Sequence, residues 1–286
     1  MPHRGEGPGV VTTMHRPYAR IRNAEPSVTT IIGALDKPGL PWAAARETAM
    51  RAVYHEDWRD MDPAQAVDLL RRHHRGVWDG RAAVGTLVHA VNERWAAGEA
   101  ADVDQMIGDA LEDDGAAAGW RAEPDLFADV VHGYLDGLER FWHEWTPEQH
   151  EVEAIVRMPG VYVGQRDWRC VMGGRGYLLD LKTTAEQDAE KGIYADSWSL
   201  QLAAYNHAPE IVRYEEGDDG RPVEVGTEPN GVAERCGIVH LRGDGHFTLY
   251  EIDAGRDVFD RFCDLARVHA WRRKPPVPRP ITREGA

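Results

Sequence analysis

The chain has 286 residues, 42% of them hydrophobic, which is enough for one large core or two small ones. Its formal net charge of -15 argues against a protein that coats nucleic acid through bulk electrostatics, because phosphate binding depends on lysine and arginine. Any contact with DNA is therefore expected to be local. With no run of about eighteen apolar residues and no secretory signal pattern, we expect a cytoplasmic protein that does not bind membranes.

The first half of the chain has helical periodicity. In residues 26–53, the pattern of apolar residues predicts a short apolar segment, a Pro-Gly break and an amphipathic helix. Pro63 is expected to open one helix, and residues 85–95 to lie in another. The Ala- and Asp-rich sequence up to Glu123 is predicted to be an exposed connection, which a helix over residues 126–145 follows.

The second half changes to short β-prone runs that Pro-Gly and Gly-Gly turns separate, which predicts an antiparallel meander. The runs are residues 151–158, 162–172 and 176–184. The later elements are expected in this order: a helix at 197–208, a polar insertion at 215–231, a hairpin of 235–241 with 247–252, and a helix at 258–271. The insertion is predicted to be a mobile surface loop. This order is typical of an α/β sandwich with a mixed central sheet.

The run at 176–184 carries two opposite charges among leucines. Side chains alternate across a strand, so Asp180 and Lys182 point to one face while Leu179 and Leu181 point to the other. Burial of such charges is costly unless they pair or meet a ligand. The run is therefore either an edge strand with a solvated face or a strand that presents a carboxylate and a lysine to a cleft.

The preceding run can bring a second carboxylate to the same place. If the two runs pair through Gly173 and Gly174, Asp167 lies beside Asp180, and a divalent cation would relieve the repulsion between them. As an alternative, Asp167 is an exposed residue paired with an arginine such as Arg169. Upstream, a glycine at position 164 allows either a close approach or a bulge.

The helix around residues 85–95 offers a histidine. Gly85, His89 and Glu93 share one face at i, i+4 and i+8. Taken alone, His89 is either a structural histidine or a metal ligand. Glu93 is a partner for His89, a solvent-exposed charge or a further ligand.

Four motifs follow one another along the chain: GTLVH, the GxxD of Gly164 to Asp167, DLK, and QLAAY. In this order, and in these helix and strand contexts, they resemble the motifs of RecB-like nucleases in the PD-(D/E)XK superfamily. The resemblance covers about residues 26–239, and the PSVTTII and LPWAAA runs look like phage-type exonucleases of that group. It implies a metal-dependent DNA exonuclease of recombination, repair or phage replication, in a bacterial cell or encoded by its phage.

The resemblance also implies roles for single residues. His89, Asp167 and Asp180 would bind Mg²⁺ or Mn²⁺, and the backbone carbonyl of Leu181 would add a ligand. Asp167 and Asp180 would thereby be catalytic together with Lys182. The lysine is expected to orient or help deprotonate the attacking water, because burial can lower its pKa.

Other positions match the motifs of the family less specifically. Gln201 and Tyr205, at i and i+4 of a helix, match positions that contact the DNA strand near the scissile phosphate. Glu153 falls where many relatives have a glutamate near the site, and it reads equally well as an exposed alternate of Glu151. Arg166 stands where the superfamily name has proline.

Relatives with an iron-sulfur cluster carry four cysteines. This chain has three scattered ones without a CxxC spacing, so we expect no cluster and no disulfide framework. They are Cys170, Cys236 and Cys263.

The expected organisation is one nuclease domain over residues 26–274, between a flexible arm at 1–25 and a flexible tail at 275–286. Its helical part spans 26–148 and its catalytic sheet core 149–274. The implied fold is α/β, a restriction-endonuclease-like core whose mixed sheet is flanked by helices, with an N-terminal helical extension. The alternative function is a non-catalytic module of this fold that binds DNA or a recombination or replication protein. Such a module would have lost one of the four motif residues, and none is missing.

Overall fold

The computed structural model describes residues 25–35, 39–113, 115–184, 195–217, 219, 222–275 and 277. The predicted arm and tail lie almost entirely outside these residues. Within the described ranges, no helix combines the length and the apolar character needed to cross a bilayer.

The centre of the molecule is a mixed sheet, which in the described ranges has seven strands in the order β5-β4-β1-β2-β3-β6-β7. The strands are β1 Glu148–Met158, β2 Tyr162–Met172, β3 Arg175–Thr184, β4 Glu210–Glu216, β5 Pro222–Pro229, β6 Arg235–Arg242 and β7 Phe247–Glu251. β3 and β6 are parallel and the other neighbours are antiparallel. The predicted α/β class with a mixed sheet is confirmed.

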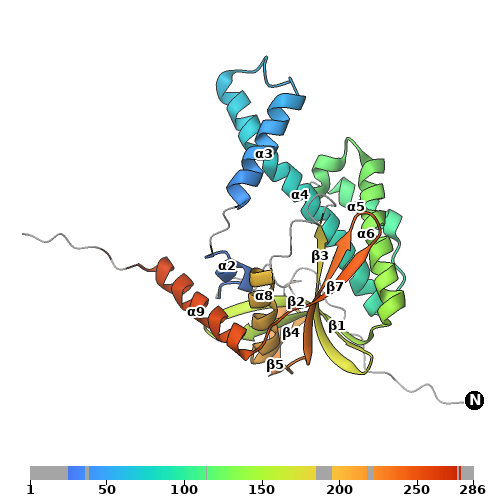
Figure 1. Ribbon diagram of the computed structural model, residues 1–286, viewed down its shortest axis with the longest axis vertical. Coiled ribbons are helices and arrows are strands. Elements are labelled where there is room, and N and C mark those ends of the chain that lie inside the picture. Colours follow the sequence, from blue (N-terminus) through green and yellow to red (C-terminus); the bar gives the residue numbers. More distant parts are fainter. Residues whose placement is uncertain are drawn as a thin grey trace, which may run out of the picture.

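Helices cover both faces of this sheet (Figure 1). Their bounds are α2 Val28–Ile32, α3 Gly39–Tyr54, α4 Pro63–Ala96, α5 Val103–Glu112, the 3-10 helix η1 Ala116–Trp120, α6 Pro124–Trp145, α8 Ala195–His207 and α9 Arg256–Arg273. One core joins α2, α8 and α9 to the sheet, and the other joins α4, α5, η1 and α6 to it. β3 thus lies between two helical layers, with Leu179 and Leu181 toward α4 and α6 and Asp180 in contact with Gln201 of α8.

Two helical segments differ from the sequence prediction. α4 is one continuous helix of 34 residues where two were expected, with Pro63 in its first turn and Asp62 accepting a hydrogen bond from the Ala64 N–H. Gly80 is needed for packing, since a Cβ there would lie 2.7 Å from Trp120 Nε1. The predicted exposed connection instead contains α5, because one of its aspartates caps the helix and Ile107 is buried.

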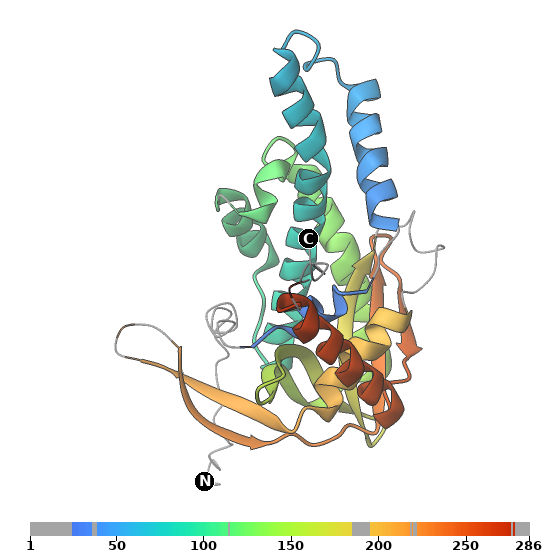
Figure 2. The same cartoon turned by 90° about the vertical axis from the view of Figure 1, so that its left-hand side faces the viewer.

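The predicted loop at 215–231 is wrong over most of its length, because it contains strand β5. Among the described strands β5 pairs with β4 alone, and the two strands extend away from the body of the sheet (Figure 2). An ion pair of Arg213 with Glu228 joins the two strands, and Arg157 of β1 forms a further ion pair with Glu224 of β5. Most of β5 is exposed, which explains why its composition resembles that of a loop.

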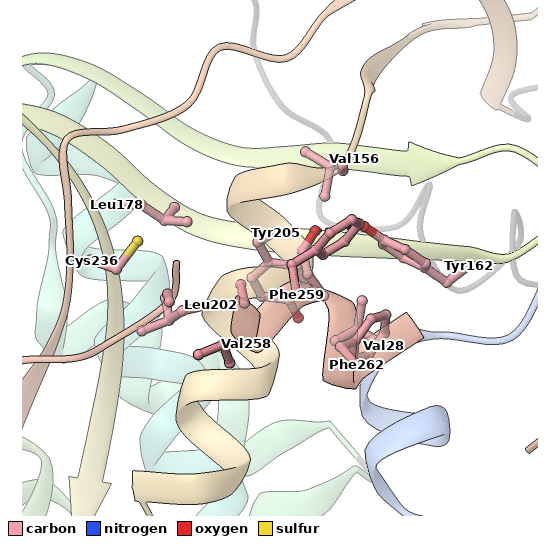
Figure 3. Packing of buried hydrophobic residues seen from close by; sticks show 14 of the residues in the cluster. Val28, Val156, Tyr162, Leu178, Leu202, Tyr205, Cys236, Val258, Phe259 and Phe262 are labelled. Atoms are coloured by element: carbon pink, nitrogen blue, oxygen red, sulfur yellow. Dashed lines mark hydrogen bonds between the residues drawn. The ribbon is translucent and has the colours of Figure 1, made fainter. Parts of the chain in front are cut away.

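Packing between β2 and α8 sets the position of α8. Figure 3 shows Tyr205 and Leu202 of α8 in one apolar cluster with Tyr162 of β2 and Val28 of α2. The Tyr162 hydroxyl donates a hydrogen bond to the Ala204 carbonyl at 2.7 Å. A Cβ on Gly164 would lie 2.5 Å from Tyr205 Cε1, so this glycine serves a close approach, one of the two alternatives that the sequence left open.

We therefore expect Gly164→Ala to destabilise the fold by about 1–3 kcal/mol, because the methyl group would displace the Tyr205 ring and Val28. Urea unfolding of parent and variant measures this difference. Gly176→Ala on β3 is the matched control, since a Cβ there meets no atom within 4 Å. Equal unfolding midpoints for the two variants would contradict the packing argument.

Candidate metal centre

The candidate site begins at the hairpin of β2 and β3. The strands turn at Gly173 and Gly174, whose φ angles of 56° and 77° lie in the left-handed region that favours glycine. Trp168 pairs with Leu179, so the next step along the register brings Asp167 opposite Asp180. The predicted pairing of the two runs through this turn is confirmed.

Three side chains from separate elements converge here. His89 of α4, Glu153 of β1 and Asp167 of β2 are partly buried, and each offers one ligand atom within 4.8 Å of the others. Among the described residues, these three form the cluster of side chains that could hold a metal ion. It contains two of the three side chains predicted as ligands, and it adds the glutamate whose position the sequence left open.

α4 approaches β3 closely at this point. His89 Nε2 lies 3.2 Å from the Leu181 carbonyl oxygen, and His89 Nδ1 lies 3.5 Å from Asp167 Oδ2. The Leu181 N–H donates to Asp167 Oδ2 at 3.1 Å. One turn before the histidine, a Cβ on Gly85 would lie 3.2 Å from Thr183 Oγ1, so the glycine allows the helix and the strand to lie close together.

Glu153 reaches the cluster because the backbone of β1 is irregular there. Its φ of 53° is in the left-handed region, which costs energy for a residue with a side chain. Val152 packs in the α4 and α6 core while Ala154 packs in the α8 and α9 core, so residues that should share a face lie on opposite faces. Glu151 forms ion pairs with Arg166 and Arg213, away from the cluster.

The carboxylates crowd one another. Burial, followed by the charges of Asp167, Glu93 and Asp180, raises the pKa of Glu153 to about 9. Burial and Asp167 also raise the pKa of Asp180 to about 6, although Lys182 counteracts them. A cation among these groups would remove the repulsion, and imidazole with carboxylate oxygens is a donor set that suits Mn²⁺ or Mg²⁺. The residues present therefore fit a divalent ion.

The raised pKa of Glu153 predicts that the metal-free protein loses stability as the pH rises. The folded chain holds this proton up to about pH 9, whereas the ordinary pKa is 4.5, so the stabilisation is complete below about pH 4.5 and disappears as the pH approaches 9. Glu153→Gln cannot ionise and should show a weaker loss over this window. Urea midpoints of parent and variant in EDTA, measured at a series of pH values, test the prediction. Curves that run parallel would count against it.

Asp180 and Lys182 form an ion pair next to the cluster. Asp180 is only 1% exposed, and its carboxylate contacts the Lys182 ammonium. Burial alone would lower the pKa of Lys182, but Asp180 and Asp167 outweigh it and the net pKa lies above its ordinary value. The expectation of a lysine whose pKa burial lowers is therefore wrong in the metal-free protein, where Lys182 is an ammonium at neutral pH.

Gln201 and Tyr205 lie behind this pair. Gln201 Nε2 donates to Asp180 Oδ1 at 3.1 Å and lies 3.2 Å from the Tyr205 hydroxyl. Tyr205 is 4% exposed and belongs to the α8 core, so in this structure it positions Gln201 and does not face solvent. Contact of these two residues with DNA remains a prediction, and it would need the tyrosine to move.

The remaining predicted positions are structural. Arg166 is 1% exposed and forms an ion pair with Glu151. Its guanidinium group also donates a hydrogen bond to Asn230 Oδ1 at 2.5 Å. Cys170 packs in the core beside α4 and α6, whereas Cys236 and Cys263 pack in the core beside α8 and α9. The sheet separates the two cores, so the three thiols do not converge on one site.

Comparisons with known proteins add little to this description. No family model and no curated protein matches the chain. A solved structure described as "Crystal structure of SSO0001" aligns over 68% of this chain and 76% of its own, with 15% identity and a TM-score of 0.30.

Proposed function

We propose that this chain is a metal-dependent deoxyribonuclease of the PD-(D/E)XK type, with a restriction-endonuclease-like core, that acts as a RecB-like exonuclease. The observation that carries the proposal is the convergence of His89, Glu153 and Asp167 beside the Asp180–Lys182 ion pair. Glu153 and Asp167 come from two neighbouring strands and His89 from α4, which is distant in the sequence, so their meeting is a property of the fold. The four ordered sequence motifs provide independent support.

His89, Glu153 and Asp167 would hold Mg²⁺ or Mn²⁺, with Asp180 and the Leu181 carbonyl at the edge of the site. A bound divalent ion lowers the pKa of a water molecule and neutralises charge that develops on a phosphate. The position of Asp180 is fixed from behind by Gln201, so its carboxylate has little freedom to turn.

Lys182 has a role that its charge defines. As an ammonium balanced by Asp180, it donates hydrogen bonds to the scissile phosphate or orients the attacking water, and it does not take up a proton. The carboxylates of the cluster are then left to accept the proton of that water.

The proposal is tested by incubating the protein with end-labelled linear duplex DNA and with covalently closed circles, each in Mg²⁺, Mn²⁺ or EDTA. We expect degradation of the linear DNA in either metal, none in EDTA, and intact circles. Equal cutting of the circles would indicate an endonuclease. Binding without any cutting would favour the non-catalytic module, and activity in EDTA would remove the metal mechanism.

A further inference from the structure

α4 continues well beyond the sheet, to the end where α3 packs against it (Figures 1 and 2). A helix repeats its direction after eighteen residues, which is five turns at 3.6 residues per turn, so Arg71 lies on the same stripe as His89. Arg75, Trp78 and Gly85 also lie on this stripe, because the steps from Arg71 to His89 are four, three, seven and four residues. We call Arg71, Arg75 and Trp78 the upper stripe.

The two ends of this stripe have different surroundings. At the lower end, Gly85 faces Thr183 and His89 faces the Leu181 carbonyl. At the upper end, Arg71 and Arg75 are exposed and Trp78 is half-buried, with its ring against His74 at a centroid distance of 4.9 Å. The face that looks into the candidate metal centre therefore continues along the helix as an open surface.

The helical segment that carries this surface is rich in basic residues, although the chain as a whole has a net charge of -15. The segment from residue 71 to residue 81, RRHHRGVWDGR, holds four arginines and two histidines against one aspartate. Asp68 is shared between Arg71 and Arg72, each at 3.0 Å, so one carboxylate balances two guanidinium groups. Arg75 forms no ion pair with any residue that the structure describes.

We propose that the upper stripe binds the sugar-phosphate backbone of a DNA strand that leads to the metal centre. The inference rests on the proposed nuclease function and assigns it a substrate track. Fourteen residues separate Arg75 from His89, a rise of about 21 Å along the helix. Phosphates along one strand of a duplex are spaced about 3.4 Å apart on its axis, so Arg75 meets the strand about six nucleotides from the scissile bond.

The chemistry of the stripe fits this ligand. Guanidinium groups bind phosphate oxygens through paired N–H donors, and an indole ring can lie against a base or a sugar. A local basic track also explains how an acidic protein can hold DNA, because only the surface that leads to the site has to be positive.

The test compares two double variants with the parent in EDTA, where nothing is cut. Arg71→Ala/Arg75→Ala removes the track, and Arg256→Ala/Arg261→Ala on α9 removes two exposed arginines that pair with aspartates of their own helix. Fluorescence anisotropy gives the affinity for a blunt duplex of about twenty base pairs between about 50 and 200 mM KCl.

We expect the track variant to bind on the order of tenfold more weakly, with a salt dependence of log K that is shallower by about 1.8, since each lost phosphate contact contributes about 0.9. The α9 variant should keep the slope of the parent. Arg75→Ala alone should lower the slope by about 0.9, which guards against a folding defect from the loss of the Arg71–Asp68 pair. A track variant with the affinity and slope of the parent would overturn the proposal.

A small substrate separates this failure from failure of the nuclease. Bis(para-nitrophenyl) phosphate is too short to reach Arg75, so in Mn²⁺ parent and track variant should hydrolyse it at the same rate, while the track variant degrades linear DNA with a higher KM. Slower hydrolysis of the small diester by the track variant would place these arginines in the catalytic machinery and contradict a binding track. If no variant cuts any diester but the salt slopes still differ as expected, the track stands and the nuclease function fails.

Discussion

Lys182→Ala is expected to bind Mn²⁺ and DNA nearly as well as the parent and to cut DNA slower by a factor on the order of a hundred or more. The reason is that His89, Glu153 and Asp167 stay in place, whereas the ammonium that we propose to face the phosphate or the water is lost. Calorimetric titration with Mn²⁺, a gel-shift assay and a cleavage time course measure the three properties separately.

Two controls accompany this variant. The substitution leaves the buried Asp180 carboxylate without its cation, so folding has to be checked by a thermal melt. Lys182→Arg keeps the charge and should retain more activity than alanine if charge is what the site needs. A folded Lys182→Ala protein that cuts at the rate of the parent would show that the proposed site is wrong.

Asp167→Asn should fail differently, because it removes one of the clustered ligand atoms. We expect Mn²⁺ affinity and cleavage to fall together, with the loss of cleavage on the order of a hundredfold or more, since an ion held by these ligands would contribute several kcal/mol of charge stabilisation. His89→Ala should behave likewise and be partly restored by high Mn²⁺. The matched control is Asp129→Asn, an exposed aspartate on α6. Unchanged Mn²⁺ binding by Asp167→Asn would exclude it as a ligand.

The sheet and its strands could be predicted because their signals are local. Alternation of side chains and the Gly173–Gly174 turn give β2 and β3 their pairing, and this pairing alone brings Asp167 opposite Asp180. β5 could not be predicted, because it is solvated and pairs with a single neighbour, so it lacks the apolar face that marks a strand in the sequence.

The position of Glu153 could not be read from its strand. Alternation places it on the same face as Glu151, and only the left-handed backbone at Glu153 itself brings it to His89 and Asp167. A residue with a side chain rarely adopts this conformation, so no local pattern predicts it. The burial of Tyr205 is likewise a tertiary effect, because it depends on the room that Gly164 leaves on a strand far away in the chain.

The direction in which the pKa of Lys182 shifts could not be predicted from the sequence either. The sequence of the strand indicates that Lys182 is buried, and burial by itself lowers the pKa of a lysine. The opposite shift results from two carboxylates, of which Asp180 is close in the sequence and Asp167 comes from the neighbouring strand. The balance between burial and charge therefore depends on the folded hairpin.

The proposed metal centre is tested most directly by the Mn²⁺ dependence of linear DNA cleavage by the parent, by Glu153→Gln and by Glu148→Gln, which changes an exposed glutamate of the same strand. We predict no cleavage in EDTA, coincident curves for the parent and Glu148→Gln, and at least about a tenfold higher half-saturating Mn²⁺ concentration for Glu153→Gln, the equivalent of one lost ligand contact of about 1.4 kcal/mol. Cleavage by the parent in EDTA, or a Glu153→Gln curve that coincides with that of the parent, would contradict it.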